Sequence, residues 1–380
     1  MYEFLRVLVD GMGLMHLMLD QAIMIMIALG LMYLGIVKKY EPLLLIPISF
    51  GMLIANLPMA NLSAHDQGGL LYFLYQGVRL VIYPPLIFLC LGALTDFGPL
   101  ISRPSSALIG IGGQLGIFSA FLLALGISRI IPGLNPFTFQ EAAAIGIIGS
   151  SDGPTAIYLT ATLAPHILPT IAIAAYSYMA LVPLIQPPIM LALTTDEERV
   201  VVMPEPKAVT QRQKILFPIW MTIITVLLVP AAGSLISMMM LGNLIRECGI
   251  VERYSRTLQN DLLNVLTLLL AVAIGSTSTA EAILNLNTIV IICLGLLAFM
   301  FGTVGGVLVA KLLYKISGGK VNPLIGNSGV SAMPMAARVS QKWGQHFNPH
   351  NHLLMHAMGP IVASTVGSAI VAGIFIAMFR

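Results

Sequence analysis

One ionisable side chain lies in a long uncharged stretch and is the first candidate for chemistry. Residues 142–195 are 54 residues with a single formal charge, that of Asp152. It stands in the run Gly-Ser-Ser-Asp-Gly-Pro-Thr (149–155), whose hydroxyls and backbone carbonyls are the oxygen ligands that hard cations prefer. The alternative is that Asp152 caps a short helix in a water-exposed turn, with Pro154 in its first turn. Because an uncompensated carboxylate in an apolar setting is costly, the sequence favours a cation site.

A second polar stretch, later in the chain, offers oxygens without charge. Residues 322–334 contain no acidic side chain but four neutral oxygen-bearing ones, namely Asn322, Asn327, Ser328 and Ser331. One carboxylate combined with neutral dipoles suits a monovalent cation better than Ca²⁺, which usually recruits several carboxylates. The two stretches together predict a site for a monovalent cation.

Arg338 is the basic side chain nearest to the second stretch. It follows Ser331 by seven residues, which is two helical turns, so we expect both to project from one helix face. An arginine there could pair with the carboxylate of a substrate or with Asp152. The alternative is that Arg338 extends to the membrane surface and carries no specific role.

Two tyrosines and a group of histidines are weaker candidates. Tyr176 and Tyr178 lie in an uncharged helical stretch, where a phenol could donate a proton or anchor the helix at a membrane interface. Four histidines gather near the C-terminus, namely His346, His350, His352 and His356. No cysteine or acid accompanies them, so a polar loop is favoured over a metal site.

The composition decides which class of protein must position these residues. Only 9% of the 380 residues are charged, 57% are hydrophobic and the mean hydropathy is +0.92. A soluble domain carries about 25% charged residues, so a cytosolic enzyme, a disordered protein and a secreted disulfide scaffold are excluded. The net charge of +3 contains no basic run, which excludes nucleic acid as a partner. What remains is an all-α polytopic integral membrane protein.

About 9–11 hydrophobic segments are expected to form the membrane helices. They are residues 21–37, 42–58, 78–95, 105–131, 142–163, 167–193, 215–240, 262–275, 286–314, 323–337 and 353–379. Two of them, 262–275 and 323–337, are too short to span a bilayer securely. Segment 142–163 is long enough but is interrupted around 149–155, which predicts a broken or re-entrant helix that lines a cavity.

The remaining segments are polar or amphipathic. Apolar residues at helical spacing in 1–19 predict a helix lying on the membrane surface. Residues 196–214 and 246–261 are rich in charges of both signs, so we expect loops in water. With Lys38 and Lys39, the first of these loops indicates the cytoplasmic side by the positive-inside rule.

An internal repeat divides the chain into two membrane halves, 20–195 and 215–380. The pattern Ile-Gly-Ser-Ser at 148–151 resembles Ile-Gly-Asn-Ser at 325–328, and Gly112-Gly113 resembles Gly305-Gly306. Paired interrupted segments in corresponding halves are the best sequence indication of a transport site, so we expect inverted halves whose broken helices, around 149–155 and 322–334, meet near the midplane. Gly112 and Gly116 do not fit a dinucleotide fingerprint and instead indicate close helix packing.

Four motifs together resemble one known family. They are Gly-Ser-Ser-Asp-Gly-Pro-Thr (149–155), Asn-Pro-Leu-Ile-Gly-Asn-Ser-Gly-Val-Ser-Ala-Met-Pro (322–334), Ala-Arg-Val (337–339) and His-Ala-Met-Gly-Pro (356–360). The chain resembles the β subunits of the sodium-pumping biotin-dependent decarboxylases, which act on oxaloacetate, methylmalonyl-CoA, glutaconyl-CoA or malonate. The resemblance runs from about residue 36 to the C-terminus. It implies decarboxylation of carboxybiotin coupled to outward movement of Na⁺.

The resemblance also implies roles for individual residues. Asp152 takes the position of the sodium-binding acid, and Tyr178 that of a functional tyrosine. The second-half functional positions fall on Asn322, Gly326, Ser331 and Arg338. Na⁺ would displace a proton that reaches carboxybiotin through Tyr178 or Ser331, while Arg338 would hold the biotin carboxylate. The complete expected set of ion ligands is Asp152, Asn322, Gly326, Asn327, Ser328 and Ser331.

The biotin itself must come from elsewhere. A biotin-bearing lysine usually stands between methionines, and none of the eight lysines here follows a methionine. The resemblance therefore implies a biotin-carrier protein, a carboxyltransferase and a small membrane-anchor subunit as partners. It further implies a homo-oligomer within the complex, in the bacterial inner membrane. A Na⁺- or H⁺-coupled secondary transporter without decarboxylase chemistry is the alternative function, and an uncoupled channel or scaffold is the third.

Overall fold

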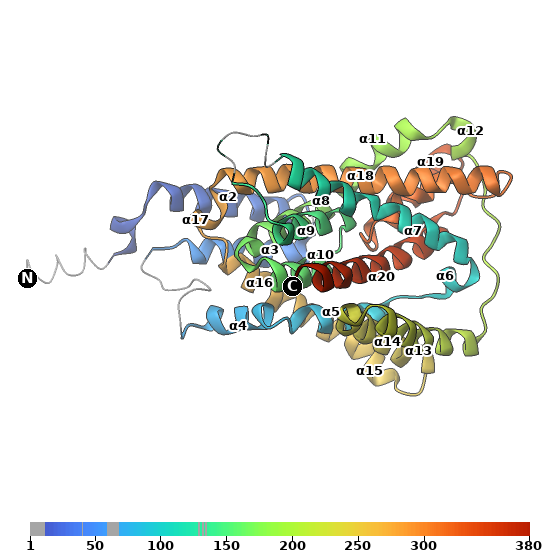
Figure 1. Cartoon of the computed structure of the whole chain (residues 1–380), viewed down its shortest axis with the longest axis horizontal. Helices are drawn as coiled ribbons and strands as arrows, with labels where there is room; N and C mark the ends of the chain where they lie inside the picture. The colour runs from blue at the N-terminus through green and yellow to red at the C-terminus, as the bar shows by residue number, and fades with distance from the viewer. Residues whose placement is uncertain (1–11, 40, 59–67, 128–129, 131–132, 134) are drawn as a thin grey trace, which may run out of the picture.

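The computed structural model describes residues 12–39, 41–58, 68–127, 130, 133 and 135–380. Within these ranges the chain is α-helical and contains no β-strand, as the composition predicts. Most helices run along the long axis of the molecule (Figure 1). In that view α18 (Leu286–Ile316) follows one edge, α13 (Gln211–Leu228) and α14 (Gly233–Cys248) lie at the opposite edge, and α20 (Leu354–Phe379) runs between them.

The other helices of the first half are α2 (Leu19–Ile36), α3 (Pro42–Ala55), α4 (Leu70–Arg79), α5 (Tyr83–Leu94), α6 (Gly98–Ser102), α7 (Ala107–Gly113), α8 (Leu115–Ile127), α9 (Phe139–Ile147), α10 (Gly153–Leu163) and α11 (Leu168–Leu193). The connection between the halves contains α12 (Asp196–Arg199). The other helices of the second half are α15 (Glu252–Thr257), α16 (Leu263–Ser276), α17 (Ala280–Ile283) and α19 (Met335–Phe347). Short 3₁₀ turns include η3 (Ile148–Ser150), η5 (Pro230–Ala232) and η7 (Pro323–Gly329).

Five helical stretches in the described part of the chain are long and apolar enough to cross a membrane. They are Leu19–Ile36, Pro104–Ile127, Glu252–Ser276, Leu286–Ile316 and Leu354–Phe379. Two bent pairs raise the number to seven, and one of them, α4 with α5, turns by 69° just before the Pro84-Pro85 pair. The chain is therefore a multi-pass membrane protein whose remaining hydrophobic segments are divided into shorter helices.

The expected single helix over 215–240 is wrong. The chain instead forms two helices, α13 and α14, joined by the turn η5. The reason is local, since Pro230 has no backbone N–H to continue the ladder of α13. The two helices then pack against each other as a hairpin.

The charged stretch 246–261 is also not a loop. After a turn that follows Gly249, whose φ is +67°, it is helical from Glu252 and continues through α15 and a π-helical turn into α16. Exposed charges are tolerated on this helix because opposite charges lie one turn apart, as in the 2.6 Å contact between Arg256 and Glu252. This extension lengthens the segment expected at 262–275 to the 25 residues of Glu252–Ser276.

The two other polar segments follow their predictions in part. Residues 1–11 of the expected surface helix lie outside the described residues, and the described remainder forms one 3₁₀ turn, Gly13–His16, before α2 begins. The stretch 196–214 contains the short helix α12 and an extended connection before α13 begins. Thr195 caps α12 through a reciprocal contact with Glu198.

Glycines allow α7 and α18 to cross at close range. A Cβ on Gly112 would come within 2.8 Å of the Gly305 carbonyl oxygen, and one on Gly305 within 2.2 Å of the Gly112 carbonyl oxygen. The contact is reciprocal between the two glycine pairs that the internal repeat relates, and the division into two related halves stays a prediction. The contact confirms the predicted close packing. A Cβ on Gly113 would meet the Gly329 carbonyl oxygen at 1.7 Å, so α7 also packs closely against η7, which belongs to the second break.

Candidate functional site

The first break places Asp152 at a helix N-terminus. Helix α9 passes into η3, and Ser151 then adopts a left-handed backbone conformation with φ of +53°, which is uncommon for a residue other than glycine. Asp152 is the N-cap of α10 and accepts a bond from the Thr155 backbone N–H. Asp152 therefore caps a helix, as the alternative interpretation expected. The cap is buried, with Asp152 only 4% exposed, and does not lie in a water-exposed turn.

The Asp152 carboxylate is held by hydroxyl groups. Its Oδ2 accepts hydrogen bonds from Thr155 Oγ1 at 2.8 Å and from Ser368 Oγ of α20 at 2.7 Å. No basic side chain in the described ranges forms an ion pair with it. A buried carboxyl group with hydroxyl partners and no cationic one has no positive charge beside it to balance its ionised form. Its ionisation is therefore favourable only together with the binding of a cation, which is what a cation site requires.

The second break meets the first directly. After η7 the chain is not helical over 330–332, and the Ser331 backbone N–H donates to the Ser150 carbonyl oxygen at 2.7 Å. The Ser331 hydroxyl donates to Ser364 Oγ of α20 at 3.2 Å. The two interrupted segments predicted from the sequence thus touch each other, and α20 contacts the key side chain of each.

A cavity of about 130 Å³ lies at this junction. One wall comes from the two breaks together with α11 and α20, and contains Ser151, Asp152, Gly153, Pro154, Tyr176, Met179, Ser331, Met333 and Thr365. The opposite wall comes from α3, α5, α14 and α16, and contains Leu44, Ile87, Leu91, Thr95, Met239, Leu263, Thr267 and Leu270. Among the lining residues the Ser151 hydroxyl is buried and has no hydrogen-bond partner within the described structure. Asp152 and Ser331 therefore share one cavity, as the paired breaks predicted.

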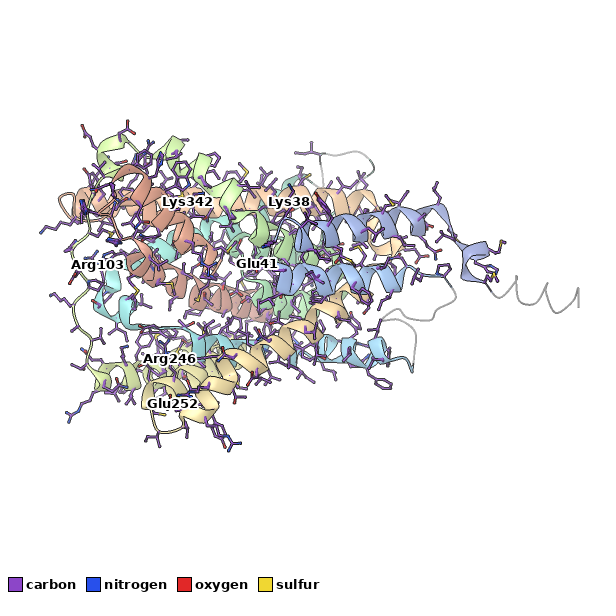
Figure 2. All side chains as sticks on the ribbon, turned by 180° about the vertical axis from the view of Figure 1, so that it is seen from behind. Lys38, Glu41, Arg103, Arg246, Glu252 and Lys342 are labelled. Carbon is purple, nitrogen blue, oxygen red and sulfur yellow. The ribbon has the colours of Figure 1, made fainter. Side chains whose placement is uncertain are left out.

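Arg338 does not share a helix face with Ser331, so that expectation is wrong. Helix α19 begins only at Met335, and Ser331 lies in the non-helical segment before it. Arg338 is exposed and outside the cavity lining. Burial raises the pKa of Glu41, at the start of α3, and the nearby Arg338 guanidinium partly opposes that rise. Figure 2 shows Glu41 where α2 and α3 are joined, with Lys342 of α19 labelled on the same side of the molecule.

The two tyrosines separate. Tyr176 lines the cavity, with its ring against Gly153 beside Asp152. Tyr178 points away, and its hydroxyl donates to the Ile292 carbonyl oxygen of α18. The structure therefore brings Tyr176 to the site, whereas the resemblance had selected Tyr178.

The other second-break residues have partners of their own. Asn327 exchanges two hydrogen bonds of 2.9 Å with Gln186 of α11, and its Oδ1 accepts from Ser340 and Ser328. Asn322 donates to the carbonyl oxygens of Arg199 and Val201. Gly326 packs against the backbone of α18. None of Asn322, Gly326, Asn327 or Ser328 lines the cavity, and a role for them as ion ligands stays a prediction.

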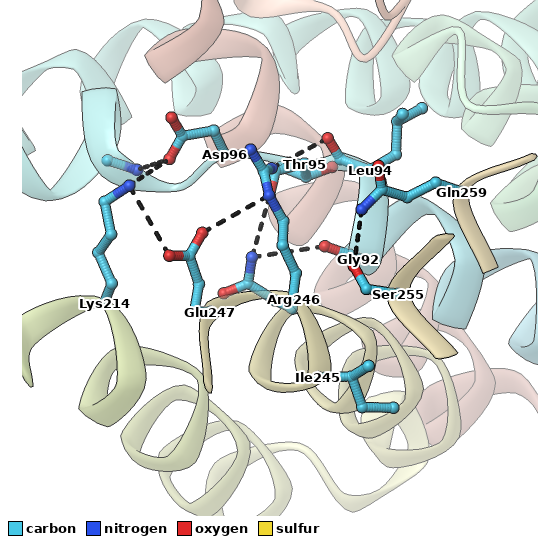
Figure 3. A network of polar contacts seen from close by, with 12 residues as sticks. Gly92, Leu94, Thr95, Asp96, Lys214, Ile245, Arg246, Glu247, Ser255 and Gln259 are labelled. Atoms are coloured by element: carbon cyan, nitrogen blue, oxygen red, sulfur yellow. Dashed lines mark hydrogen bonds and ion pairs between the residues drawn. The ribbon is translucent and has the colours of Figure 1, made fainter. Parts of the chain in front are cut away.

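Polar contacts fix the helix that forms the opposite wall. Buried Asn243 of α14 donates to the Thr95 carbonyl oxygen at 2.9 Å, just after the end of α5. Beside it Lys214 contacts both Asp96 and Glu247, at 3.3 and 3.7 Å (Figure 3). These contacts tie the end of α5 to α13 and α14, so that Thr95 is held at the cavity.

Sequence reasoning missed the hydroxyls of α20 and of the opposite wall. Thr95 directly follows the apolar helix α5, and Thr267, Thr365 and Ser368 stand in apolar helices, where serine and threonine usually bond to their own helix carbonyls. Nothing in their local pattern distinguishes them. The histidines are dispersed over α19, α20 and the connection between them, and no three potential metal-binding side chains come together in the described ranges.

These features define a class of protein. A multi-pass helical membrane protein, with two broken helices that meet at a buried carboxylate, has the architecture of ion-coupled transport proteins. Residues 20–379 match the family described as Na⁺-transporting oxaloacetate decarboxylase beta subunit. The chain belongs to that family, and so it is the β subunit of a sodium-transporting decarboxylase complex.

Three relatives show the range of the family. The chain is 52% identical to the methylmalonyl-CoA decarboxylase β subunit of Propionigenium modestum, over 97% of each chain. It is 52% identical to the glutaconyl-CoA decarboxylase β subunit of Acidaminococcus fermentans, over 94% of this chain and 92% of the relative. It is 46% identical to oxaloacetate decarboxylase beta chain 2 of Salmonella typhi, over 98% of each. That last alignment runs over 428 positions, so this relative includes residues with no counterpart in the 380 of this chain.

Proposed function

We propose that the chain binds Na⁺ in the cavity between the two breaks and couples its export to decarboxylation of carboxybiotin. The observation that carries the proposal is Asp152, a buried carboxylate without a cationic partner, in the same cavity as Ser331. The unpartnered hydroxyl of Ser151 adds a second available oxygen. Na⁺ is bound well by one carboxylate and several neutral oxygens, and this donor set fits it.

The chemistry of decarboxylation requires a proton. Cleavage of the N–C bond of carboxybiotin releases CO₂, and the ureido nitrogen then takes up one H⁺. Entry of Na⁺ at Asp152 releases a proton there, because a cation and a proton compete for one carboxylate. Tyr176 and Ser331 line the same cavity as Asp152, and we propose that their hydroxyls pass this proton on. Tyr178 remains a predicted donor. Binding of the transported ion thus supplies the proton that the reaction consumes.

Arg338 is proposed to receive the carboxylate of the carboxybiotin. It is exposed on α19, the helix that follows the second break, so a bulky partner can reach it. The planar guanidinium can hold a carboxylate at two points, which a lysine cannot. Glu41 influences this guanidinium through its charge, but no ion pair joins the two side chains in the described part of the chain.

The partners are proposed from the family and from the chain's own lysines. With no lysine after a methionine, the biotin is carried by a separate protein, and a carboxyltransferase selects the acid that loads it. We further propose a small membrane-anchor subunit, a homo-oligomer of this chain and a place in the bacterial inner membrane. The charged segment 196–214 then faces the cytoplasm, where biotin is loaded.

The experiment is reconstitution of the purified chain alone in liposomes. The proposal predicts no exchange of Na⁺ for a small carboxylate, and Na⁺-dependent release of CO₂ when carboxylated biotin carrier is supplied. Exchange of Na⁺ against a carboxylate without any biotin would identify a secondary transporter and would overturn the proposal.

A further inference from the structure

Helix α20 places two buried serines one turn apart, each against one of the two breaks. Ser368 contacts Asp152 of the first break, and Ser364 contacts Ser331 of the second. Both serines are fully buried within an apolar helix of 26 residues. No motif in the sequence singles them out, and the mechanism above does not use them.

The Ser368 hydroxyl has two acceptors within reach but one proton. Asp152 Oδ2 lies 2.7 Å from its Oγ, and the Thr365 carbonyl oxygen of the preceding turn lies 2.9 Å away. A hydrogen bond to a charged acceptor is shorter and about twice as strong as one between neutral groups. The Ser368 proton is therefore donated to the Asp152 carboxylate. Thr155 holds Oδ2 from the same chain segment as Asp152, and Ser368 holds it from α20.

Ser364 holds the second break in a similar way. Its Oγ accepts from Ser331 Oγ at 3.2 Å and from Nε2 of Gln114, at the end of α7, also at 3.2 Å. The carbonyl oxygen of Ser364 is a further acceptor for Gln114, at 3.3 Å. Helix α20 thus sets where the oxygens of both breaks stand relative to each other.

We propose that Ser368 is a positioning residue for the transported ion, acting through Asp152, and that Ser364 does the same for Ser331. The inference rests on the proposed function, since it takes Asp152 to be the Na⁺ ligand. A hydroxyl that holds a carboxylate in place fixes the geometry of ion binding, so its loss weakens Na⁺ binding rather than the subsequent chemistry.

The test compares Na⁺-dependent decarboxylation by the assembled complex carrying Ser368→Ala, Ser368→Thr or Ser368→Cys. Loss of a charge-assisted hydrogen bond predicts that Ser368→Ala raises the Na⁺ concentration for half-maximal activity about tenfold, with little change in maximal rate. Ser368→Thr retains the hydroxyl, so its Na⁺ concentration for half-maximal activity should equal that of the wild type. Ser368→Cys, a weaker donor, lies between them and also serves if the alanine variant does not assemble.

The matched control is Thr303→Ala, which removes an equally buried hydroxyl of α18 that bonds only to its own helix at Phe299. Its Na⁺ dependence should equal that of the wild type. An unchanged Na⁺ requirement in both Ser368→Ala and Ser368→Cys overturns the inference, as does an effect confined to maximal rate. If Asp152→Asn also keeps its Na⁺ dependence, the proposed ion site itself fails. If only the Ser368 variants are normal, the positioning role alone fails.

Discussion

Replacing Asp152 by asparagine separates its role in ion binding from its role in the fold. Asparagine keeps the shape of the side chain, and an oxygen in the place of Oδ2 still accepts from Thr155 Oγ1 and Ser368 Oγ. Only the long 3.4 Å bond from the Thr155 backbone N–H to Oδ1 is lost. Two charge-assisted hydrogen bonds become neutral ones, at a cost of about 1 kcal/mol each. Removal of a buried charge offsets that cost, because desolvation of an ion is worth several kcal/mol. We therefore expect the variant to fold and to insert normally.

Ion binding responds very differently. Removing one partner of a buried ion pair costs about 3–5 kcal/mol, because the other charge stays buried without compensation. With about 1.4 kcal/mol for each factor of ten, Na⁺ should bind at least about 100-fold more weakly. Decarboxylation at ordinary Na⁺ concentrations should then be lost.

The assay is CO₂ release by the complex as a function of Na⁺ concentration, with thermal unfolding in detergent as the measure of fold. The control is Glu141→Gln, which removes a carboxylate at the start of the same broken segment. Glu141 pairs with His166 at 2.7 Å and does not line the cavity. A folded Asp152→Asn variant with wild-type Na⁺ dependence would refute the reasoning.

The other predictions concern the second break, its neighbours and the helix crossing. Ser331→Ala removes one neutral oxygen and should raise the Na⁺ concentration for half-maximal activity, measured by CO₂ release, without a large change in maximal rate. Arg338→Lys loses the planar fork and should lower turnover more than Na⁺ affinity in the same assay. Burial raises the pKa of Glu41, so ionisation of this side chain destabilises the folded protein as the pH rises through that pKa. The Glu41→Gln variant, which cannot ionise, should therefore have a higher melting temperature than the wild type at about pH 8. At about pH 4, where Glu41 is protonated, it should have no advantage. Gly113→Ala places a Cβ against the backbone of η7 and should reduce the yield of folded protein in size-exclusion chromatography, whereas Gly126→Ala in α8, with open space around it, should not.

The first break could be predicted because it puts a charged residue, glycines and a proline into an otherwise apolar segment. A single carboxylate among 54 residues, flanked by Gly and Pro, is easily recognised in a membrane protein sequence. The structure places Asp152 at a break, as expected. Close helix packing at Gly112 was predictable from its spacing to Gly116, but the sequence did not indicate that Gly305 of α18 would be its partner.

What the sequence did not show depends on the path of the backbone. Helical spacing related Ser331 to Arg338, but the chain before α19 is not helical, so that spacing does not apply. Tyr176 and Tyr178 have nearly the same local environment in sequence, and only the orientation of α11 directs one to the cavity and the other to α18. Ser368 lies 216 residues from Asp152, and such a contact follows from packing alone.

Coupling of Na⁺ movement to decarboxylation is the central claim, and ²²Na⁺ uptake tests it most directly. The complete complex would be reconstituted in liposomes with its biotin domain outside, and uptake measured on addition of the acid, with and without avidin. The account predicts that the acid drives Na⁺ accumulation, that avidin abolishes it, and that Asp152→Asn abolishes it as well. Na⁺ accumulation that persists in the presence of avidin, or in the Asp152→Asn complex, would contradict the account.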